Sequence, residues 1–323
     1  MYFNENNQFY HGIMFHHFHD DKIYKRSQGS INKTQLFELI NFIGRKNILD
    51  ANVFLEKSKA NELKQNEVCI TFDDAVKSQI DIALPVLEDF KIKSFFFVYT
   101  SLFEGKPDNL EIFRFFRHNY FSSIDEFYSS FYKFLDKDIK KFFLEKEKLI
   151  KEKKLRYPFY SVEDIKFRLI RSKLLNKKEY ENIMLLMMND RKFDKEKYLS
   201  ILFFNEKDLN TLADLDHFVG LHSHTHPISI ENLSAEEQRF EYTKCLNTLK
   251  KILGKKVKKI NSMSHPCGSY NDQTLKVLKD LNIEIGFRNE MTNERKIDNQ
   301  KVKNSFLEIA RQDHSEIIKK MKN

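Results

Sequence analysis

Two groups of residues in this chain have types and spacing that could do chemistry. An apolar run ends in two adjacent carboxylates, Asp73 and Asp74. Far along the chain, three of the 11 histidines, His222, His224 and His226, fall within five positions. Two imidazoles and one carboxylate are a common ligand set for a catalytic metal, and a second carboxylate beside the metal can take a proton from water. Together the two groups therefore indicate a metal-dependent hydrolytic site.

Each group alone also fits an ordinary structural role. Aspartate is common in turns and at helix N-caps after a strand, because its side chain accepts backbone hydrogen bonds there. A single histidine is more often structural than a metal ligand. A histidine cluster and a separate Asp-Asp pair favour the metal if both lie at strand ends, where barrels and open α/β sheets place their catalytic groups.

Strand-like and helix-like segments alternate around both groups. Short β-rich runs predict strands at 11–19, 68–72, 94–99, 218–221, 260–263, 283–288 and 307–310. Apolar positions at helical spacing follow Asn32 or Thr34, either of which can cap the helix. A capping box at Ser234 opens a helix that ends near Gly254, and we expect Pro85 to bend the helix that follows the Asp-Asp pair. Strand, helix and strand at this spacing form βαβ units, so the pattern predicts an α/β fold with a parallel sheet.

The stretch 104–215 differs from the chain on either side. It carries aromatic, leucine and methionine residues at helical spacing, and a lysine and glutamate run at 144–156. The spacing predicts a helical insertion within one domain that spans 1–323. We interpret its aromatic and methionine stripes as packing rather than as ligand contacts.

Composition narrows the class of protein. Of 323 residues, 41% are hydrophobic and 32% are charged, as in a globular protein. No uncharged apolar run is long enough for a transmembrane helix, and the N-terminus lacks the basic and apolar regions of a secretory signal, so we expect a cytoplasmic protein. Three cysteines without a C-x-x-C pair argue against a disulfide framework or a cysteine-zinc ribbon.

The net charge is +8. This excess could steer an anionic substrate such as a phosphorylated sugar, or it could be a solvated lysine-rich surface. No basic and aromatic motif of a nucleic-acid-binding protein accompanies it, so no nucleic-acid partner is expected. The sequence leaves the oligomeric state open.

Three stretches of the chain resemble the polysaccharide deacetylase family, the NodB-homology carbohydrate esterases of the family 4 type. The family's first motif, T-F-D-D, is matched by residues 71–74, and its second, H-[ST]-x-[ST]-H-P, is matched in full by 222–227. The third, R-x-P-Y-G, is matched in part by 264–268, which read Ser-His-Pro-Cys-Gly. The resemblance covers roughly 11–103 and 216–315 and leaves the predicted insertion outside it.

The resemblance implies a fold, a reaction and a set of residue roles. The fold is a distorted (β/α)7 barrel of the deacetylase type, and the reaction is hydrolysis of an N- or O-acyl group on a sugar. Asp73 would be the general base and the metal ligands would be Asp74, His222 and His226, whereas His224 is not a ligand in this match. Zinc is the expected divalent metal, with Co²⁺, Ni²⁺ and Fe²⁺ as alternatives that suit the same ligands.

The third motif departs from the family pattern. The family holds its base aspartate with an arginine at the position of Ser264, and we hypothesise that Arg311, at the end of the last predicted strand, does this instead. In the same motif the resemblance places the oxyanion against the backbone N–H of Cys267, between Pro266 and Gly268.

The general acid has no close match. The family's last motif supplies it as a histidine at a strand end, and the nearest counterpart here is His314. His16 and His265 are competing candidates for the same role.

These residues predict a metal-dependent hydrolase that removes an N-acetyl or O-acetyl group from a sugar. Without an export signal, the expected substrate is an intracellular sugar nucleotide, sugar phosphate or lipid-linked precursor in surface polysaccharide biosynthesis. Two alternatives stay open: deformylation of a formamido sugar at the same site, and a non-catalytic glycan-binding protein that has kept the fold. The acid released and the presence of a bound metal distinguish them.

Overall fold

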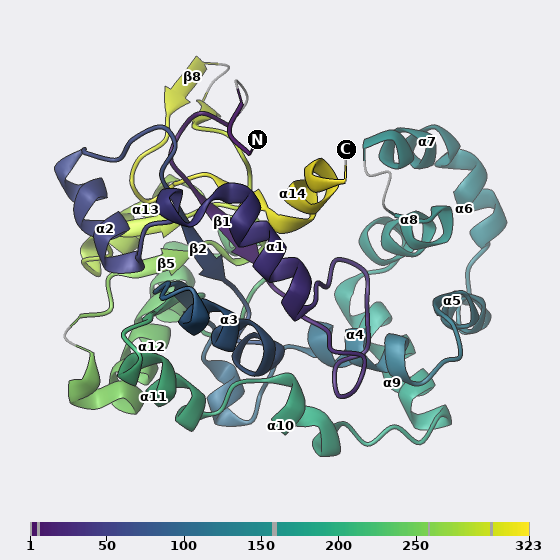
Figure 1. Cartoon of the computed structure of the whole chain (residues 1–323). Helices are drawn as coiled ribbons and strands as arrows, with labels where there is room; N and C mark the ends of the chain where they lie inside the picture. The colour runs from purple at the N-terminus through teal and green to yellow at the C-terminus, as the bar shows by residue number, and fades with distance from the viewer. Residues whose placement is uncertain (1, 5–6, 157–159, 258, 298–299, 323) are drawn as a thin grey trace. The chain divides into compact units, whose positions relative to one another are not determined.

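Seven parallel strands form a nearly closed barrel (Figure 1). The computed structural model describes residues 2–4, 7–156, 160–257, 259–297 and 300–322. The barrel strands are β1 (His11–Phe15), β2 (Val68–Phe72), β3 (Phe95–Val98), β4 (Phe218–Leu221), β5 (Ser262–Ser264), β6 (Ile285–Phe287) and β9 (Arg311–Asp313). They lie in the order β6-β5-β4-β3-β2-β1-β9, and each pairing is parallel. The predicted α/β fold with a distorted (β/α)7 barrel is confirmed.

The barrel closes between β6 and the segment that leads into β9. Ile309 bridges Phe287 of β6 in parallel, with hydrogen bonds of 2.9 Å from Ile309 N to Gly286 O and from Arg288 N to Ile309 O. A Cβ on Gly286 would lie 2.6 Å from the carbonyl oxygen of Leu307, so only glycine permits this close approach. Because β9 pairs with β1 on its other edge, this segment joins the two ends of the sheet.

Most of the helices pack their apolar faces against the buried strands in one large core, and residues 51–55 pack in a second core cluster with Phe95, Phe97 and Phe287. The helices of the barrel unit are α1 (Lys33–Ile43), α2 (Ala51–Ala60), α3 (Leu84–Asp89), α11 (Glu206–Asp214), α12 (Ala235–Leu253), α13 (Asp272–Asp280) and α14 (His314–Met321). Asn32 caps α1 and Ser234 caps α12, each in a capping box, and α12 ends at Gly254. These three predictions are confirmed, because caps depend on residues close together in the sequence.

The structure refines two predicted elements. Pro85 lies in α3, and the π-helical turn Gln79–Ala83 runs directly into that helix, so the missing N–H of proline falls where the helical hydrogen bonding changes. A bend at Pro85 stays a prediction. The last strand is Arg311–Asp313 rather than 307–310, because Glu308 N first closes a turn onto Ser305 O. The sequence reasoning did not identify α2, α14 or the antiparallel hairpin of β7 (Glu294–Ile297) and β8 (Gln300–Lys303).

Residues 109–199 form a second compact unit, which we call the helical unit; the barrel unit comprises 1–108 and 200–323. The longer helices of the helical unit are α4 (Asn109–Asn119), α5 (Ile124–Lys133), α6 (Ile139–Glu145), α7 (Glu147–Arg156), α8 (Val162–Leu169) and α9 (Lys177–Asp190). The rings of Phe127, Phe131 and Phe167 lie at its centre, with centroids 5.0 to 5.9 Å apart. The assignment of 104–215 as an insertion in a single deacetylase domain stays a prediction. None of the helices in the described parts of the chain is both long and apolar enough to cross a bilayer.

Candidate active site

Both predicted groups lie directly after barrel strands, in loops with a left-handed backbone. Asp73 and Asp74 follow β2, and His222 follows β4. Asp74 has a φ of 73° and His226 a φ of 56°, a region that residues other than glycine rarely adopt. Such positions concentrate at functional sites, because only surrounding contacts hold a backbone in this conformation. The two loops therefore fix their side chains at the carboxyl-terminal edge of the sheet.

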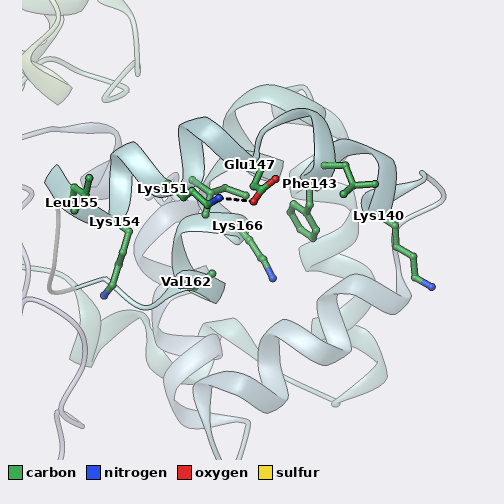
Figure 2. A pocket seen from close by; sticks show the side chains of 10 residues that line it. Lys140, Phe143, Glu147, Lys151, Lys154, Leu155, Val162 and Lys166 are labelled. Carbon is green, nitrogen blue, oxygen red and sulfur yellow. Dashed lines mark ion pairs between the residues drawn. The ribbon is translucent and has the colours of Figure 1, made fainter.

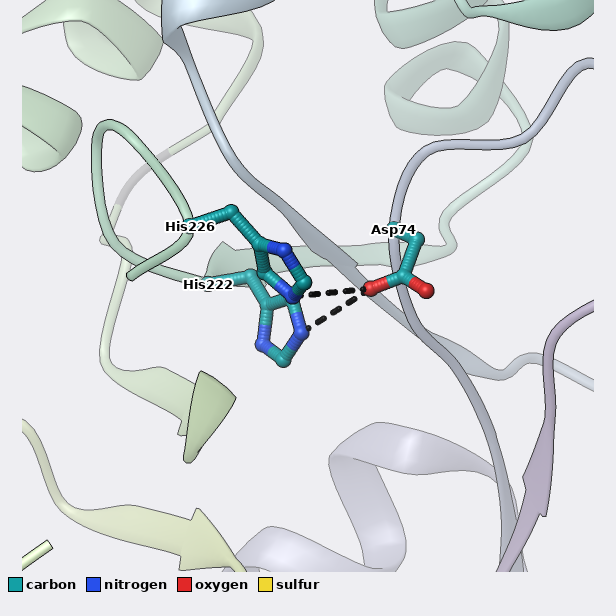
Figure 3. Close-up of side chains that lie close together, drawn as sticks. All are labelled: Asp74, His222 and His226. Atoms are coloured by element: carbon teal, nitrogen blue, oxygen red, sulfur yellow. Dashed lines mark ion pairs between the residues drawn. The ribbon is translucent and has the colours of Figure 1, made fainter. Parts of the chain in front are cut away.

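Asp74, His222 and His226 converge on one point (Figure 3). The Oδ1 atom of Asp74 lies 3.1 Å from His222 Nε2 and 3.3 Å from His226 Nε2. One ligand atom from each residue lies within 4.8 Å of the other two. The predicted metal ligands are thus brought together although almost 150 residues separate them in the chain.

The other nitrogen of each imidazole is occupied. His222 Nδ1–H donates to the carbonyl oxygen of Ser264 at 2.9 Å, and His226 Nδ1–H donates to Asp108 Oδ2 at 2.8 Å. These acceptors leave each Nε2 facing Asp74, and a ring held by its Nδ1–H in this way is the arrangement found around metal-bound histidines. Two imidazole nitrogens and one carboxylate oxygen, oriented in this way, fit a divalent metal.

Charge interactions within this group are strong. Burial lowers the pKa of His226, yet the Asp74 carboxylate and the hydrogen bond to Asp108 outweigh it and raise that pKa well above its ordinary value. Burial also opposes ionisation of Asp74, but the charge of His226 and hydrogen bonds from His222 and His226 hold the Asp74 pKa well below its ordinary value. The cluster therefore holds the Asp74 carboxylate ionised beside two buried imidazoles.

Asp73 lies beside this group and has different partners. Both of its oxygens meet the Arg311 guanidinium: Nη1 donates to Oδ1 at 2.8 Å, and Nη2 lies 2.7 Å from Oδ2. Ser264 Oγ accepts from Arg311 Nη2 at 2.8 Å and donates to Asp73 Oδ2 at 3.1 Å. Arg311 Nε is held by the carbonyl oxygen of Arg288 at 2.7 Å. The structure thus brings Arg311 to Asp73, with Ser264 between them.

The environment keeps Asp73 ionised. Burial by itself would raise its pKa, but the charge of Arg311, with smaller contributions from His222 and His16, holds the pKa below its ordinary value. A buried carboxylate with a two-pronged arginine contact has a fixed orientation as well as a fixed charge. Asp73 is therefore ionised across the neutral pH range.

His16 also faces both acids, and it lies outside the group of predicted metal ligands. It follows β1, and its Nε2 lies 3.9 Å from Asp73 Oδ2 and 4.0 Å from Asp74 Oδ2. Its side chain is 27% exposed, so the ring reaches both the acids and solvent.

The two other candidates for the acid face away from these carboxylates. His314 begins α14, is buried, and has its ring nitrogens 3.1 Å from Met14 O and 2.9 Å from Gly29 O. His265 is buried against the ring of Tyr270, with Nε2 2.8 Å from Leu307 O, and burial lowers its pKa to about 3. Both rings bond to backbone carbonyls, an arrangement that argues against either as the proton donor.

Pro266, Cys267 and Gly268 form a 3₁₀ turn directly after β5. Cys267 has a φ of 53° and an exposed side chain, whereas Pro266 is buried. A Cβ on Gly268, at a φ of 71°, would lie 2.1 Å from Asn289 Oδ1, so this tight turn requires glycine. The turn leaves the same edge of the sheet as the two acid and histidine loops. His224 instead contacts Thr100 Oγ1 at 2.9 Å, apart from the ligand group.

Two carboxylates that support the histidine loop were not predicted from the sequence. Asp108 orients His226, and Glu241 of α12 accepts from His224 N, Thr225 N and Thr225 Oγ1 at 2.7 to 2.8 Å. Glu241 lies on the buried face of α12, with Tyr242 and Cys245. A carboxylate on the core face of an amphipathic helix needs a partner, and that pattern is the signal that could have identified it.

Barrel and site together define a parallel α/β barrel with a centre of two histidines and one aspartate. The model of the polysaccharide deacetylase family matches residues 173–286, a stretch that contains the histidine loop and the turn after β5. The resemblance to the polysaccharide deacetylase family that the motifs predicted is confirmed.

Three solved structures share the fold. The alignment with the deacetylase PplD of Streptococcus pyogenes, in complex with acetate, has a TM-score of 0.53 at 15% identity and covers 93% of this chain and 89% of that chain. For a de-N-acetylase of Aggregatibacter actinomycetemcomitans the values are 0.52, 12%, 96% and 98%, and for IcaB of Ammonifex degensii 0.52, 11%, 94% and 91%. Identities this low define the fold alone. No curated protein sequence matches the chain.

Proposed function

We propose that this protein is a metal-dependent hydrolase that removes an N-acetyl or O-acetyl group from a sugar. The observation that carries the proposal is the convergence of Asp74, His222 and His226 beside a second, separately held carboxylate, Asp73. Two acids with different partners can divide metal binding and proton transfer between them.

Asp74, His222 and His226 would hold one divalent metal, for which Zn²⁺ is our first choice and Co²⁺, Ni²⁺ and Fe²⁺ are alternatives. When bound, such a metal polarises an acyl carbonyl and lowers the pKa of water. The carbonyl oxygen of Ser264 and the carboxylate of Asp108 hold the two imidazole rings so that each Nε2 faces Asp74.

Asp73 is our general base. Arg311 and Ser264 hold its carboxylate in one orientation and keep it ionised, so it can take a proton from the attacking water. Arg311 does not reach the reacting atoms itself; it is a positioning residue that replaces, from the last strand, the arginine expected at position 264.

His16 is our general acid, because its Nε2 lies about 4 Å from both carboxylates while its ring remains partly exposed. It could pass a proton to the leaving nitrogen or oxygen of the sugar. The backbone N–H of Cys267 is our candidate for binding the oxyanion, in the turn between Pro266 and Gly268.

The substrate we propose is a cytoplasmic precursor in surface polysaccharide biosynthesis: a sugar nucleotide, a sugar phosphate or a lipid-linked sugar. The net charge of +8 supports a substrate that carries phosphate.

The test is release of acetate from N-acetylated sugar nucleotides, sugar phosphates and lipid-linked sugars, with and without a chelator. We expect release that a chelator abolishes and added Zn²⁺ or Co²⁺ restores. Asp73→Asn should abolish release, and His16→Gln should lower it while leaving metal content unchanged. Chelator-insensitive release, or full activity of Asp73→Asn, would falsify the mechanism.

The same assay separates the rival functions. Formate in place of acetate would identify a deformylase of formamido sugars that uses the same residues. A protein that binds glycans, binds no metal and releases no acid would be a non-catalytic relative. The complete set of two acids and two imidazoles, each with ordered partners, supports the enzyme over the binding protein.

A further inference from the structure

The helical unit carries an apolar groove on its surface, bounded by α6, α7 and α8 (Figure 2). The groove has a volume of about 880 Å³. Its apolar side chains include Phe143, Leu144, Leu155 and Val162. All of its lining residues belong to the helical unit.

Two leucines of this groove are unusually exposed. The side chain of Leu144 is 75% exposed and that of Leu155 is 83% exposed, the largest values among the big apolar residues of the described chain. Single exposed apolar residues are ordinary, but several around one groove, rimmed by polar groups, mark a contact surface.

The rim of the groove is basic. Lys140, Lys151, Lys154 and Lys166 line it, against one acidic residue, Glu147. Figure 2 shows lysine side chains distributed around the apolar ones rather than gathered on one side. Lys151 pairs with Glu147 at 2.6 Å and Lys166 pairs with Glu163 at 2.7 Å. The Lys154 amine donates to the carbonyl oxygen of Tyr160 at 2.7 Å.

The helix α7 adds positive charge and one exposed leucine to this groove. Its sequence, EKLIKEKKLR, contains five basic residues and two acidic ones. Ile150 is buried and Leu155 is exposed, so Leu155 alone of these two can contact lipid. Exposed apolar side chains enter the head-group layer of a membrane while nearby lysines contact lipid phosphates. The long lysine stems can lie along apolar surface with their amines at the phosphate level.

We propose that the α6–α7–α8 groove docks the protein onto the surface of a bilayer that contains anionic phospholipids. Leu144 and Leu155 enter the head-group layer, and Lys140, Lys151, Lys154 and Lys166 contact the phosphates. A membrane fits better than an acidic peptide. A bound peptide would contact apolar residues recessed inside a groove, whereas Leu144 and Leu155 are the most exposed large apolar residues here and can enter a lipid layer. The inference does not depend on the proposed deacetylase activity.

The test is co-sedimentation of the protein with vesicles of phosphatidylcholine alone or of phosphatidylcholine mixed with phosphatidylglycerol, which gives the vesicle a negative surface potential. We expect binding to the anionic vesicles only, falling as salt is raised. Leu144→Ser with Leu155→Ser should weaken binding at least about tenfold, since two apolar side chains are lost from the lipid contact. Lys151→Gln with Lys154→Gln should weaken it by a similar factor and reduce the salt dependence.

Matched controls lie on α9 of the same unit. Leu185 and Leu186 are 45% and 57% exposed, and Lys177 and Lys178 are exposed, but none of them lines the groove. Leu185→Ser with Leu186→Ser, and Lys177→Gln with Lys178→Gln, should bind vesicles as the unaltered protein does. All the substituted side chains are partly or largely exposed, and thermal unfolding checks that each variant folds. Absence of binding to anionic vesicles, or equal binding by the groove and control variants, overturns the proposal.

Discussion

Asp73 and Asp74 are neighbours in the chain, yet the regions around them stabilise negative charge by different means. Asp73 faces a permanent cation, the guanidinium of Arg311, which contacts both of its oxygens. Asp74 faces two imidazoles, His222 and His226, which bear no charge when they act as metal ligands. The Asp73 side is therefore already neutralised, whereas the Asp74 side has an unbalanced carboxylate once its histidines are neutral.

This difference explains how two adjacent acids could take separate roles. A divalent cation is drawn to the carboxylate that lacks a fixed positive partner, and Arg311 repels it from the other one. Each side also has its own support: the last strand and β5 for Asp73, and the histidine loop with Asp108 for Asp74. Substitutions on the two sides should therefore affect different quantities, the rate on one side and metal affinity on the other.

The largest effects should come from the acids themselves. Asp73→Asn should lower kcat by about 10²–10⁴-fold, because it removes the base, while leaving metal affinity within about tenfold of the unaltered protein. Asp74→Asn should weaken metal binding by at least about a hundredfold, because it removes a ligand. Metal content and titration calorimetry, measured beside acetate release, separate the two. Equal loss of metal in both variants would contradict separate roles.

The next largest effect should come from Arg311→Ala, because this change leaves the buried carboxylate of Asp73 without its charged partner. The free energy of unfolding should fall by about 3–5 kcal/mol, and kcat should fall with it. Arg311→Lys keeps the charge but presents a single point donor, so it should recover much of the stability and little of the rate. Urea unfolding and kcat are the measurements. Full kcat in Arg311→Ala would remove Arg311 from the Asp73 side.

On the Asp74 side, Asp108→Asn should weaken metal binding by about 10–100-fold, because His226 loses the carboxylate that fixes its ring. With saturating metal, kcat should change little. Glu104→Gln is the matched control: Glu104 lies 3.6 Å from Nε2 of His224, which is outside the ligand group, so its metal affinity should be unchanged. A larger change in saturated kcat than in affinity would mean that Asp108 serves the reaction directly.

Ser264→Ala should have the smallest effect. It removes one hydroxyl between Arg311 and Asp73 and leaves the direct arginine contacts in place. The activation free energy should rise by about 0.5–1.5 kcal/mol, which lowers kcat roughly two- to thirteenfold. Metal affinity should stay the same, since His222 bonds to the backbone oxygen of this residue and not to its side chain. Ser262→Ala, a buried hydroxyl two residues earlier on β5, serves as the control.

What could be predicted from the sequence was mostly local. The strand before Asp73, the capping boxes at Asn32 and Ser234 and the spacing of His222 and His226 depend on residues a few positions apart, and the structure has them as expected. The end of the last strand was displaced by a few residues, because the apolar run 307–310 is buried at the barrel seam without being the strand itself.

The partners of the site residues were harder, because the barrel brings them together from distant parts of the chain. Arg311 reaches Asp73 across 238 positions, and only the unexplained Ser264 indicated that some arginine had to replace the usual one. Asp108 lies 118 positions before His226, whose ring it holds, and Glu241 lies 17 positions after His224, from whose backbone N–H it accepts a hydrogen bond. Neither acid belongs to a motif of its own. Spacing in the sequence shows which residues have the chemistry, and the closed sheet decides which of them meet.

The position of Arg311 on the barrel seam has a consequence for the order in which the protein matures on the ribosome. The chain emerges from its N-terminus at about 5–20 residues per second, so Asp74, His222 and His226 are all outside before β9 is made. The residue that orients Asp73 belongs to the strand that closes the sheet between β6 and β1. On the proposed roles, the growing chain therefore contains its three candidate metal ligands before it contains the arginine that orients its candidate base. The base would be held in place only when the last strand pairs with the sheet.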